Sequence, residues 1–238
     1  MENEWTVAVL SDIHGNRWAL ESILEDIRNR GAGAVFNLGD SLYGPLDPVG
    51  TAKLLMDEKI TSILGNQDRL LVENSNDFAN NSSLKFVYDQ IGQKEREWLE
   101  KLKLSHLFEN EIYMCHGSPQ SDTRYLLESI DSGFDQLRAP GDILKDLSSI
   151  EQPVIFCGHS HLSRVVRLPD GKTVINPGSA GMPAYFDDLP LPHRMESGNP
   201  MAKYAMVNKR KNLITVEQIT IEHNIRTAPE SALDHEYE

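Results

Sequence analysis

The first third of the chain alternates short apolar runs with helical patterns, and this alternation restricts the fold more than any other feature. Residues 6–10, 34–38 and 60–64 are apolar runs with the length of strands that are buried on both faces. Apolar residues recur at helical spacing over residues 18–27, and residues 49–56 favour a second, shorter helix. A β-α-β-α-β order predicts a parallel sheet whose crossover connections are right-handed.

The remainder of the chain is predicted to change from helices to strands and then to hairpins. Residues 68–111 have a mostly helical pattern, whereas the strand pattern returns at 112–115 and 154–157. Residues 118–150, between those two strands, are polar with helical stretches. Two antiparallel hairpins are expected after these elements, over residues 165–175 and 204–221.

Residues 182–200 contain Pro, Asp and Gly and are predicted to form a loop of unusual length. Loops of this length in compact domains are often functional, so the segment is either a mobile surface loop or a flap near the site. A flap would let three ring side chains face a substrate: Tyr185, Phe186 and His193. Residues 227–238 are expected to be a frayed tail. Because no segment has the character of a linker, we expect one domain over residues 1–238.

The composition restricts the partners and the compartment. The chain has 23 Lys and Arg against 36 Asp and Glu, a formal net charge of −13, which argues against stable binding to nucleic acid or to an anionic membrane. No apolar stretch approaches the roughly 18–20 residues of a membrane span, and the acidic start lacks the features of a signal peptide. Cys115 and Cys157 are interpreted as small buried hydrophobes rather than zinc ligands. We therefore expect a cytoplasmic protein, which can still form homo-oligomers.

Short polar clusters follow the predicted strands, and they contain the residues with the clearest chemistry. There are five of them: residues 11–16, 39–40, 65–68, 116–117 and 158–161. Because sites in open α/β sheets form at the carboxyl ends of the strands, these clusters can converge on one crevice. Carboxylate, imidazole and amide side chains are ligands for divalent metals. Each cluster alone is weak evidence, and the ordered set is what indicates a metal site.

In this order, Asp-x-His, Gly-Asp, Gly-Asn-x-Asp, His-Gly and Gly-His-x-His resemble the motifs of the calcineurin-like metallophosphoesterases. Residues 11–20 and 176–181 are similar in particular to the small bacterial and archaeal phosphodiesterases of that superfamily. The resemblance extends from Val7 to about Val216. It implies an α/β fold in which two mixed sheets face each other and helices flank them, a four-layer α/β/β/α sandwich.

The resemblance also implies the ligands of two divalent metal ions. Asp12, His14, Asp40 and His161 would hold one ion, and Asp40, Asn66, His116 and His159 would hold the other. A bridging Asp40 is physically reasonable, because one carboxylate can join two ions about 3.5–4 Å apart. The mixed oxygen and nitrogen ligands favour Mn or Fe, and Ni, Co or Zn are also compatible. In the implied mechanism a metal-bridging hydroxide attacks phosphorus in line, while the metals and Asn66 hold the non-bridging oxygens.

One position departs from the pattern of the wider superfamily. Many members carry Gly-Asn-His-Asp/Glu at the third motif, with a His thought to protonate the leaving oxygen, whereas this chain has Gln67. An amide can donate a hydrogen bond but not a proton, so esters with good leaving groups are expected. Arg69 and His193 are the other candidate substrate contacts; the alternatives are a surface salt bridge for Arg69 and an exposed loop position for His193. Arg124 is a case similar to Arg69.

The leading hypothesis is therefore a metal-dependent phosphodiesterase that acts on a small phosphate ester, with nucleotide derivatives as one candidate class. A dinucleoside polyphosphate hydrolase is an alternative, because a phosphate leaving group would need little acid assistance. A phosphomonoesterase or protein phosphatase is a further alternative. In a different class, the fold could serve as a metal-binding scaffold without catalysis, although all the ligand positions are filled.

Overall fold

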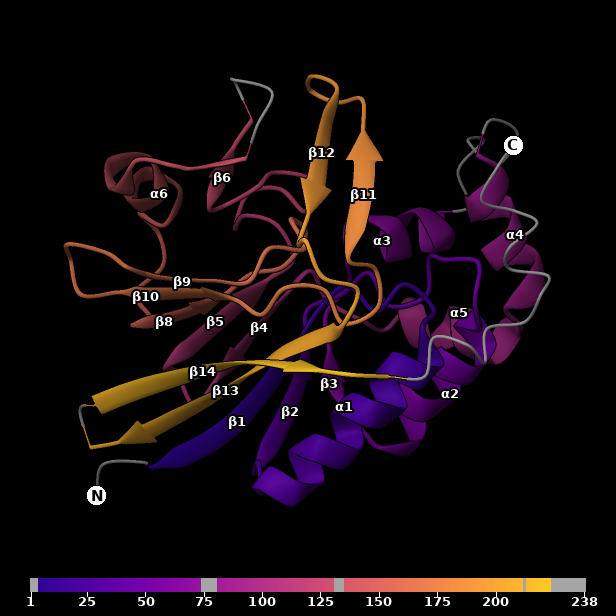
Figure 1. Ribbon diagram of the computed structural model, residues 1–238, viewed down its shortest axis with the longest axis horizontal. Coiled ribbons are helices and arrows are strands. Elements are labelled where there is room, and N and C mark those ends of the chain that lie inside the picture. The colour runs from indigo at the N-terminus through magenta and orange to yellow at the C-terminus, as the bar shows by residue number, and fades with distance from the viewer. Residues whose placement is uncertain (1–3, 74–80, 131–134, 212, 224–238) are drawn as a thin grey trace.

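Two five-stranded sheets form the centre of the protein (Figure 1), whose computed structural model describes residues 4–73, 81–130, 135–211 and 213–223. The first sheet has the strand order β14-β13-β1-β2-β3. Strands β1, β2 and β3 are parallel, whereas β13 is antiparallel to both β1 and β14. Their bounds are β1 Trp5–Leu10, β2 Ala34–Asn37, β3 Thr61–Ser62, β13 Ala202–Arg210 and β14 Leu213–Ile221.

The second sheet has the strand order β4-β5-β8-β10-β9 and is also mixed. Strand β8 is parallel to β5 and β10, while the edge strands β4 and β9 are antiparallel to their neighbours. Their bounds are β4 Ser105–Phe108, β5 Ile112–Cys115, β8 Val154–Phe156, β9 Arg164–Arg167 and β10 Thr173–Asn176. Two small antiparallel hairpins complete the strands: β6 Glu128–Ser129 with β7 Gln136–Leu137, and β11 Ala184–Asp187 with β12 His193–Glu196.

Six helices lie in the described part of the chain: α1 Arg17–Arg30, α2 Pro48–Asp57, α3 Asn66–Glu73, α4 Ser82–Gln90, α5 Gln93–Leu99 and α6 Pro140–Asp146. Helix α1 begins where the Asn16 side chain accepts a hydrogen bond from the Ala19 amide, and it ends at Gly31 in the left-handed conformation. None of these helices has the length and apolar character needed to cross a bilayer.

The apolar side chains divide the molecule into four layers. Alternate residues of β1 point to opposite faces of the first sheet, so Val7 and Val9 pack against the second sheet while Ala8 and Leu10 pack against α1. On the far face of the second sheet, Ile143 and other α6 residues pack against Ile155 and its neighbours. The layers are thus helices, first sheet, second sheet and α6, as the α/β/β/α sandwich requires.

The structure confirms the parallel β1-α1-β2-α2-β3 unit and both predicted late hairpins. The helical prediction over residues 68–111 is wrong at its end, because β4 is an edge strand with little alternation between buried and exposed positions. Residues 118–150 contain the β6–β7 hairpin as well as α6. The predicted tail, residues 227–238, lies outside the described residues.

The predicted loop over residues 182–200 is instead built around the β11–β12 hairpin. Burial alternates along both strands, and His193 and Met195 are buried on β12. The Pro- and Asp-rich pattern that suggested a loop belongs mainly to the turn between the strands. Figure 1 shows the hairpin standing above the ends of the two sheets.

Candidate metal centre

The predicted metal ligands follow the carboxyl ends of strands from both sheets. Asp12 and His14 follow β1, Asp40 follows β2, and Asn66 begins α3. From the second sheet, His116 follows β5, and His159 and His161 follow β8. Backbone hydrogen bonds join the loops, with the Asp12 amide donating to Gly39 O and the Gly158 amide to His116 O. The two sheets therefore bring their polar loops to one place.

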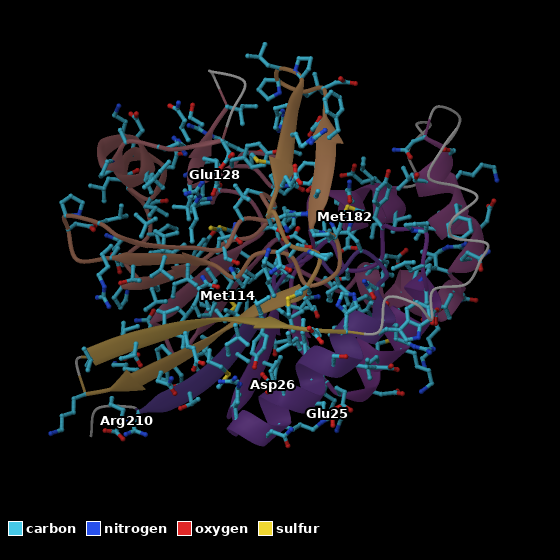
Figure 2. All side chains as sticks on the ribbon, viewed as in Figure 1. Glu25, Asp26, Met114, Glu128, Met182 and Arg210 are labelled. Atoms are coloured by element: carbon cyan, nitrogen blue, oxygen red, sulfur yellow. The ribbon has the colours of Figure 1, made fainter. Side chains whose placement is uncertain are left out.

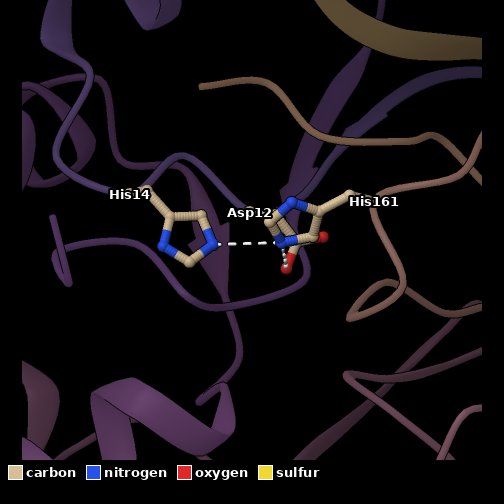
Figure 3. Close-up of side chains that lie close together, drawn as sticks. All are labelled: Asp12, His14 and His161. Carbon is tan, nitrogen blue, oxygen red and sulfur yellow. Dashed lines mark hydrogen bonds and ion pairs between the residues drawn. The ribbon is translucent and has the colours of Figure 1, made fainter. Parts of the chain in front are cut away.

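Six of these residues form two groups of three that could each hold a metal ion. One group is Asp12, His14 and His161, and the other is Asp40, His116 and His159; within each, the ligand atoms lie within 4.8 Å of one another. In the first group the Nε2 atoms of His14 and His161 are 3.1 Å apart, and His161 Nε2 is 3.4 Å from Asp12 Oδ1 (Figure 3).

The two groups adjoin through His116. Its Nε2 atom is 3.3 Å from Asp40 Oδ2 in its own group and 3.9 Å from Asp12 Oδ1 in the other. The structure thus brings together all six carboxylate and imidazole ligands that the sequence predicts.

Buried polar atoms without partners show that this donor set fits metal ions. Asp12 Oδ1, Asn66 Oδ1 and His116 Nε2 are buried and have no hydrogen-bond partner. An unsatisfied buried polar atom costs about 1–3 kcal/mol, so three of them in one site indicate a missing partner. Carboxylate oxygen, amide oxygen and imidazole nitrogen are all metal donors, and a cation satisfies each of them. The partnerless Asn66 oxygen is therefore compatible with the predicted role of Asn66 as a seventh ligand.

Backbone carbonyl groups orient all four imidazole rings. In three of them Nδ1 contacts a carbonyl oxygen, which leaves Nε2 for the site: His14 with Tyr43 O (2.7 Å), His116 with Leu38 O (2.8 Å) and His161 with Met182 O (2.6 Å). Met182 lies at the foot of the β11–β12 hairpin (Figure 2). His159 is reversed, because its Nε2 contacts Thr123 O at 3.1 Å and leaves Nδ1 for the site. Such contacts fix the tautomer of a ligating histidine.

The histidines of the site differ in the direction of their pKa shifts. Burial, together with a neighbouring imidazole, lowers the pKa of His14 and of His159 to about 4, so both are neutral as metal ligands must be. Burial opposes charge on His116 as well, but Asp40 and Asp12 raise its pKa to about 10. The His116 imidazole in turn keeps the pKa of Asp40 low despite burial. Asp40 and His116 thus stabilise each other's charged forms, and a cation held by both would take the place of the proton on His116.

Five of the ligands have a left-handed backbone conformation that residues other than glycine seldom adopt. Their φ angles are 55° for Asp12, 51° for His14, 50° for Asp40, 67° for His159 and 60° for His161. Non-glycine residues in this region cost of order 1–3 kcal/mol each, and they persist only where surrounding contacts enforce them. Such strain clusters at functional sites.

Asp68 enforces the conformation of the loop that carries Asp40. Its buried carboxylate accepts the Ser41 amide at 3.0 and 2.9 Å and the Leu42 amide at 3.1 Å. Gly65 allows the close approach of the neighbouring loop, because a Cβ atom there would lie 2.2 Å from Asp40 Oδ1. Asn66 and Asp68, two residues apart, thus place one side chain at the site and the other against the Asp40 loop.

Residues 176–181, Asn-Pro-Gly-Ser-Ala-Gly, form hydrogen bonds with two other loops that carry predicted ligands. The side-chain NH2 group of Asn176 donates to Gly158 O at 2.9 Å and to Ser160 Oγ at 3.0 Å. These bonds hold the loop that contains His159 and His161. Ser179 Oγ donates to Asp12 O at 2.8 Å. This segment therefore links the Asp12 loop of the first sheet to the histidine loop of the second.

Two tyrosines pack on the histidine loop from outside. The Tyr125 ring stacks on His159 with centroids 4.7 Å apart, and the Tyr185 ring meets the edge of His161 at 4.5 Å. The Tyr185 hydroxyl donates to His159 O at 3.0 Å and also contacts the Tyr125 hydroxyl at 2.6 Å. Tyr125 was missed by sequence reasoning, since only the fold brings it beside the histidines.

The predicted substrate contacts lie in different places. Arg69 is held by Asp122 (2.6 Å) and Glu73 (2.9 Å), as the salt-bridge alternative expects. His193 is buried rather than exposed, and its Nε2 contacts the Tyr125 hydroxyl at 2.9 Å. The backbone N–H of Gln67 donates to Asp40 Oδ1 at 2.9 Å. The buried side-chain oxygen of Gln67, Oε1, has no hydrogen-bond partner. Gln67 is therefore the one of these three that adjoins a metal ligand directly.

Comparison with known proteins gives one family. A model described as the calcineurin-like phosphoesterase superfamily domain matches residues 6–189. A protein of Methanocaldococcus jannaschii, described as uncharacterised, is 26% identical over 248 residues, which cover 94% of this chain and 90% of that protein.

Two solved structures share the fold. A metallophosphoesterase from Sphaerobacter thermophilus has a TM-score of 0.71 at 21% identity and covers 96% of this chain and 93% of that one. A conserved protein from Streptococcus pneumoniae, described as a predicted phosphoesterase, has a TM-score of 0.53 at 19% identity. The match covers 94% of this chain and 93% of that one.

Proposed function

The chain belongs to the calcineurin-like phosphoesterase superfamily, and from this we propose that it is a phosphodiesterase that uses two divalent metal ions. The first ion is bound by Asp12, His14, Asp40 and His161, and the second by Asp40, Asn66, His116 and His159. The observation that supports two ions is the pair of adjoining three-residue groups, which share no ligand but lie next to each other at His116. Asp40, which the structure groups with the second set, would be shared by both ions in this proposal.

When bound, the two ions supply the Lewis acidity that activates water for attack on phosphorus and offsets charge on the phosphate oxygens. The side chains of the protein hold the geometry. Backbone carbonyls orient the four imidazoles so that the other ring nitrogen of each is left for the site. The Asn66 side chain presents its oxygen to the site, which leaves its NH2 group to donate to a non-bridging phosphate oxygen.

The leaving group receives no proton from the residues that sequence reasoning considered for this role. Gln67 carries an amide, which cannot act as an acid. His193 contacts Tyr125 and the Leu191 carbonyl oxygen instead of facing the ligand groups. We therefore expect the enzyme to prefer esters with stable anionic leaving groups over esters of simple alkyl alcohols.

The test is hydrolysis of bis-p-nitrophenyl phosphate beside p-nitrophenyl phosphate. Metal-stripped protein should be inactive, and adding Mn²⁺, Ni²⁺ or Zn²⁺ should restore hydrolysis, with the diester cleaved faster than the monoester. Mg²⁺ serves as a comparison ion, since it prefers oxygen ligands and this site offers four imidazoles.

Asp40→Asn is the control variant, because it keeps the shape of the side chain and removes the charge that joins the two ions. It should lose metal-dependent hydrolysis and bind less metal. If the wild-type protein binds no metal and hydrolyses neither ester, the hydrolase proposal is wrong, and what remains is a scaffold that needs no metal. A scaffold would also keep its function in the Asp40→Asn variant.

A further inference from the structure

A cavity of about 1160 Å³ opens beside the metal centre, with Asn66 and His159 in its wall. Its other walls come from the β6–β7 hairpin, the start of α6 and the turn of the β11–β12 hairpin. Figure 1 shows β6, α6 and that hairpin at the same end of the molecule. Sites for drug-sized ligands have volumes of about 300–1,000 Å³. The cavity is therefore much larger than a phosphate group needs.

We propose that this cavity binds one of the two alcohol groups of the phosphodiester, an uncharged organic group of about nucleoside size, rather than a chain of further phosphates. The proposal rests on the proposed function, since the metal centre at one end of the cavity would hold the phosphate. It chooses between the phosphodiester and the dinucleoside polyphosphate alternatives.

Exposed apolar side chains support an organic ligand. Leu137 and Leu189 line the cavity, yet 49% and 74% of their surfaces are exposed to water, and Pro190 lies next to Leu189. They come from two different hairpins that contribute to the same cavity. An organic group bound between them would remove this apolar surface from water, which is favourable.

The charges of the wall argue against a polyphosphate chain. Three cationic side chains line the cavity, and each is paired with a carboxylate: Arg138 with Asp146 (2.8 Å), Arg124 with the same Asp146 (3.2 Å) and Lys145 with Asp142 (2.8 Å). Two more acidic side chains line the cavity: Asp187, and Glu128, which is paired with Arg164 outside the lining (2.8 Å). With four acidic groups against three cations, the wall offers no excess positive charge for several phosphates, and like charges in contact are unfavourable.

The experiment compares two diesters that share a p-nitrophenolate leaving group. One is methyl p-nitrophenyl phosphate, and the other is thymidine 5′-(p-nitrophenyl phosphate). Because the chemistry of the bond that breaks is the same, a difference in KM reports the binding of the second alcohol. The Mn²⁺-loaded wild-type protein should have a KM about tenfold lower for the thymidine ester.

Variants locate that difference in the cavity. The double variant Leu137→Ser/Leu189→Ser should raise KM for the thymidine ester about tenfold and leave the methyl ester unchanged. Leu191→Ser is the matched control, because Leu191 is 49% exposed in the same turn but does not line the cavity. Equal KM values for the two esters, or a double variant that affects both esters alike, would overturn the proposal.

A binding measurement separates this proposal from the proposed function. If neither ester is hydrolysed with any metal, the phosphodiesterase proposal fails, and calorimetry on the Mn²⁺-loaded protein still tests the cavity. Thymidine 5′-methyl phosphate should bind about tenfold more tightly than dimethyl phosphate, and the double variant should remove that advantage. Equal affinities, or tighter binding of diadenosine tetraphosphate than of the thymidine diester, would show that the cavity does not select an uncharged organic group.

Discussion

Replacing Tyr185 with Phe should weaken metal binding although Tyr185 is not a ligand. Its hydroxyl makes two hydrogen bonds, at 3.0 Å to His159 O and at 2.6 Å to the Tyr125 hydroxyl. At about 1 kcal/mol each, their loss amounts to about 2 kcal/mol. Since about 1.4 kcal/mol is tenfold in an equilibrium constant, the dissociation constant for metal should rise at most about thirtyfold. In other proteins, mutating the hydrogen-bond partners of metal ligands lowers metal affinity or activity by about 10–100-fold.

The assay is a competition titration of Mn²⁺ and Zn²⁺ against a coloured chelator, with urea unfolding of the metal-free protein to measure stability separately. Tyr185→Ala should weaken binding further, because it also removes the ring that meets His161 at 4.5 Å. Phe186→Ala is the matched control, since Phe186 is the next residue on β11 and is 65% exposed. If Tyr185→Phe and Phe186→Ala bind metal equally well, the hydroxyl does not position the histidine loop.

Three further predictions concern stability and reactivity. Asp68→Ala removes the acceptor for the Ser41 and Leu42 amides, and at about 1–3 kcal/mol per buried amide the free energy of unfolding in urea should fall by about 2–6 kcal/mol; a change below about 1 kcal/mol would contradict this. Removing metal with a chelator should lower the melting temperature, because ligand at 100 times its dissociation constant stabilises by about 2.7 kcal/mol; a metal that binds without changing the melting temperature would contradict it. Burial raises the pKa of Cys115 to about 12 and also raises that of Cys157, so both thiols should resist a disulfide reagent at pH 8 in the native protein and react in urea, and fast reaction in the native protein would show that they are accessible.

Local patterns were sufficient to predict the parallel strands of the first sheet and the polar clusters that follow the strands, whereas the four layers were implied by the resemblance to a family. Strand β1 is a short apolar run with Asp12 and His14 within four residues of its end, and a similar arrangement recurs at β5 with His116 and at β8 with His159. Where strands are parallel or face each other, their carboxyl ends meet in space. The motifs that follow the strands are therefore expected to lie close together in space.

The contacts that hold the ligands in place were not predictable in the same way. Thr123 orients His159 through a backbone carbonyl, which any residue type could supply. Tyr125 meets His193 across a sequence separation of 68 residues, a contact that no local pattern indicates. His193 looked like an exposed loop residue because the neighbouring prolines suggested a loop, whereas alternate burial on a short strand places it inside.

The β11–β12 hairpin joins these observations, because it contributes to the metal centre and to the cavity with different residues. Near its base, Tyr185 packs on His161 and bonds the carbonyl of His159. At its turn, Leu189 and Pro190 line the cavity. A substitution in the turn should therefore change which diester binds while metal affinity stays constant, whereas a substitution of Tyr185 should change metal affinity first. This separation follows from distance along one hairpin, so the turn can vary in sequence without disturbing the ligands that the base holds in place.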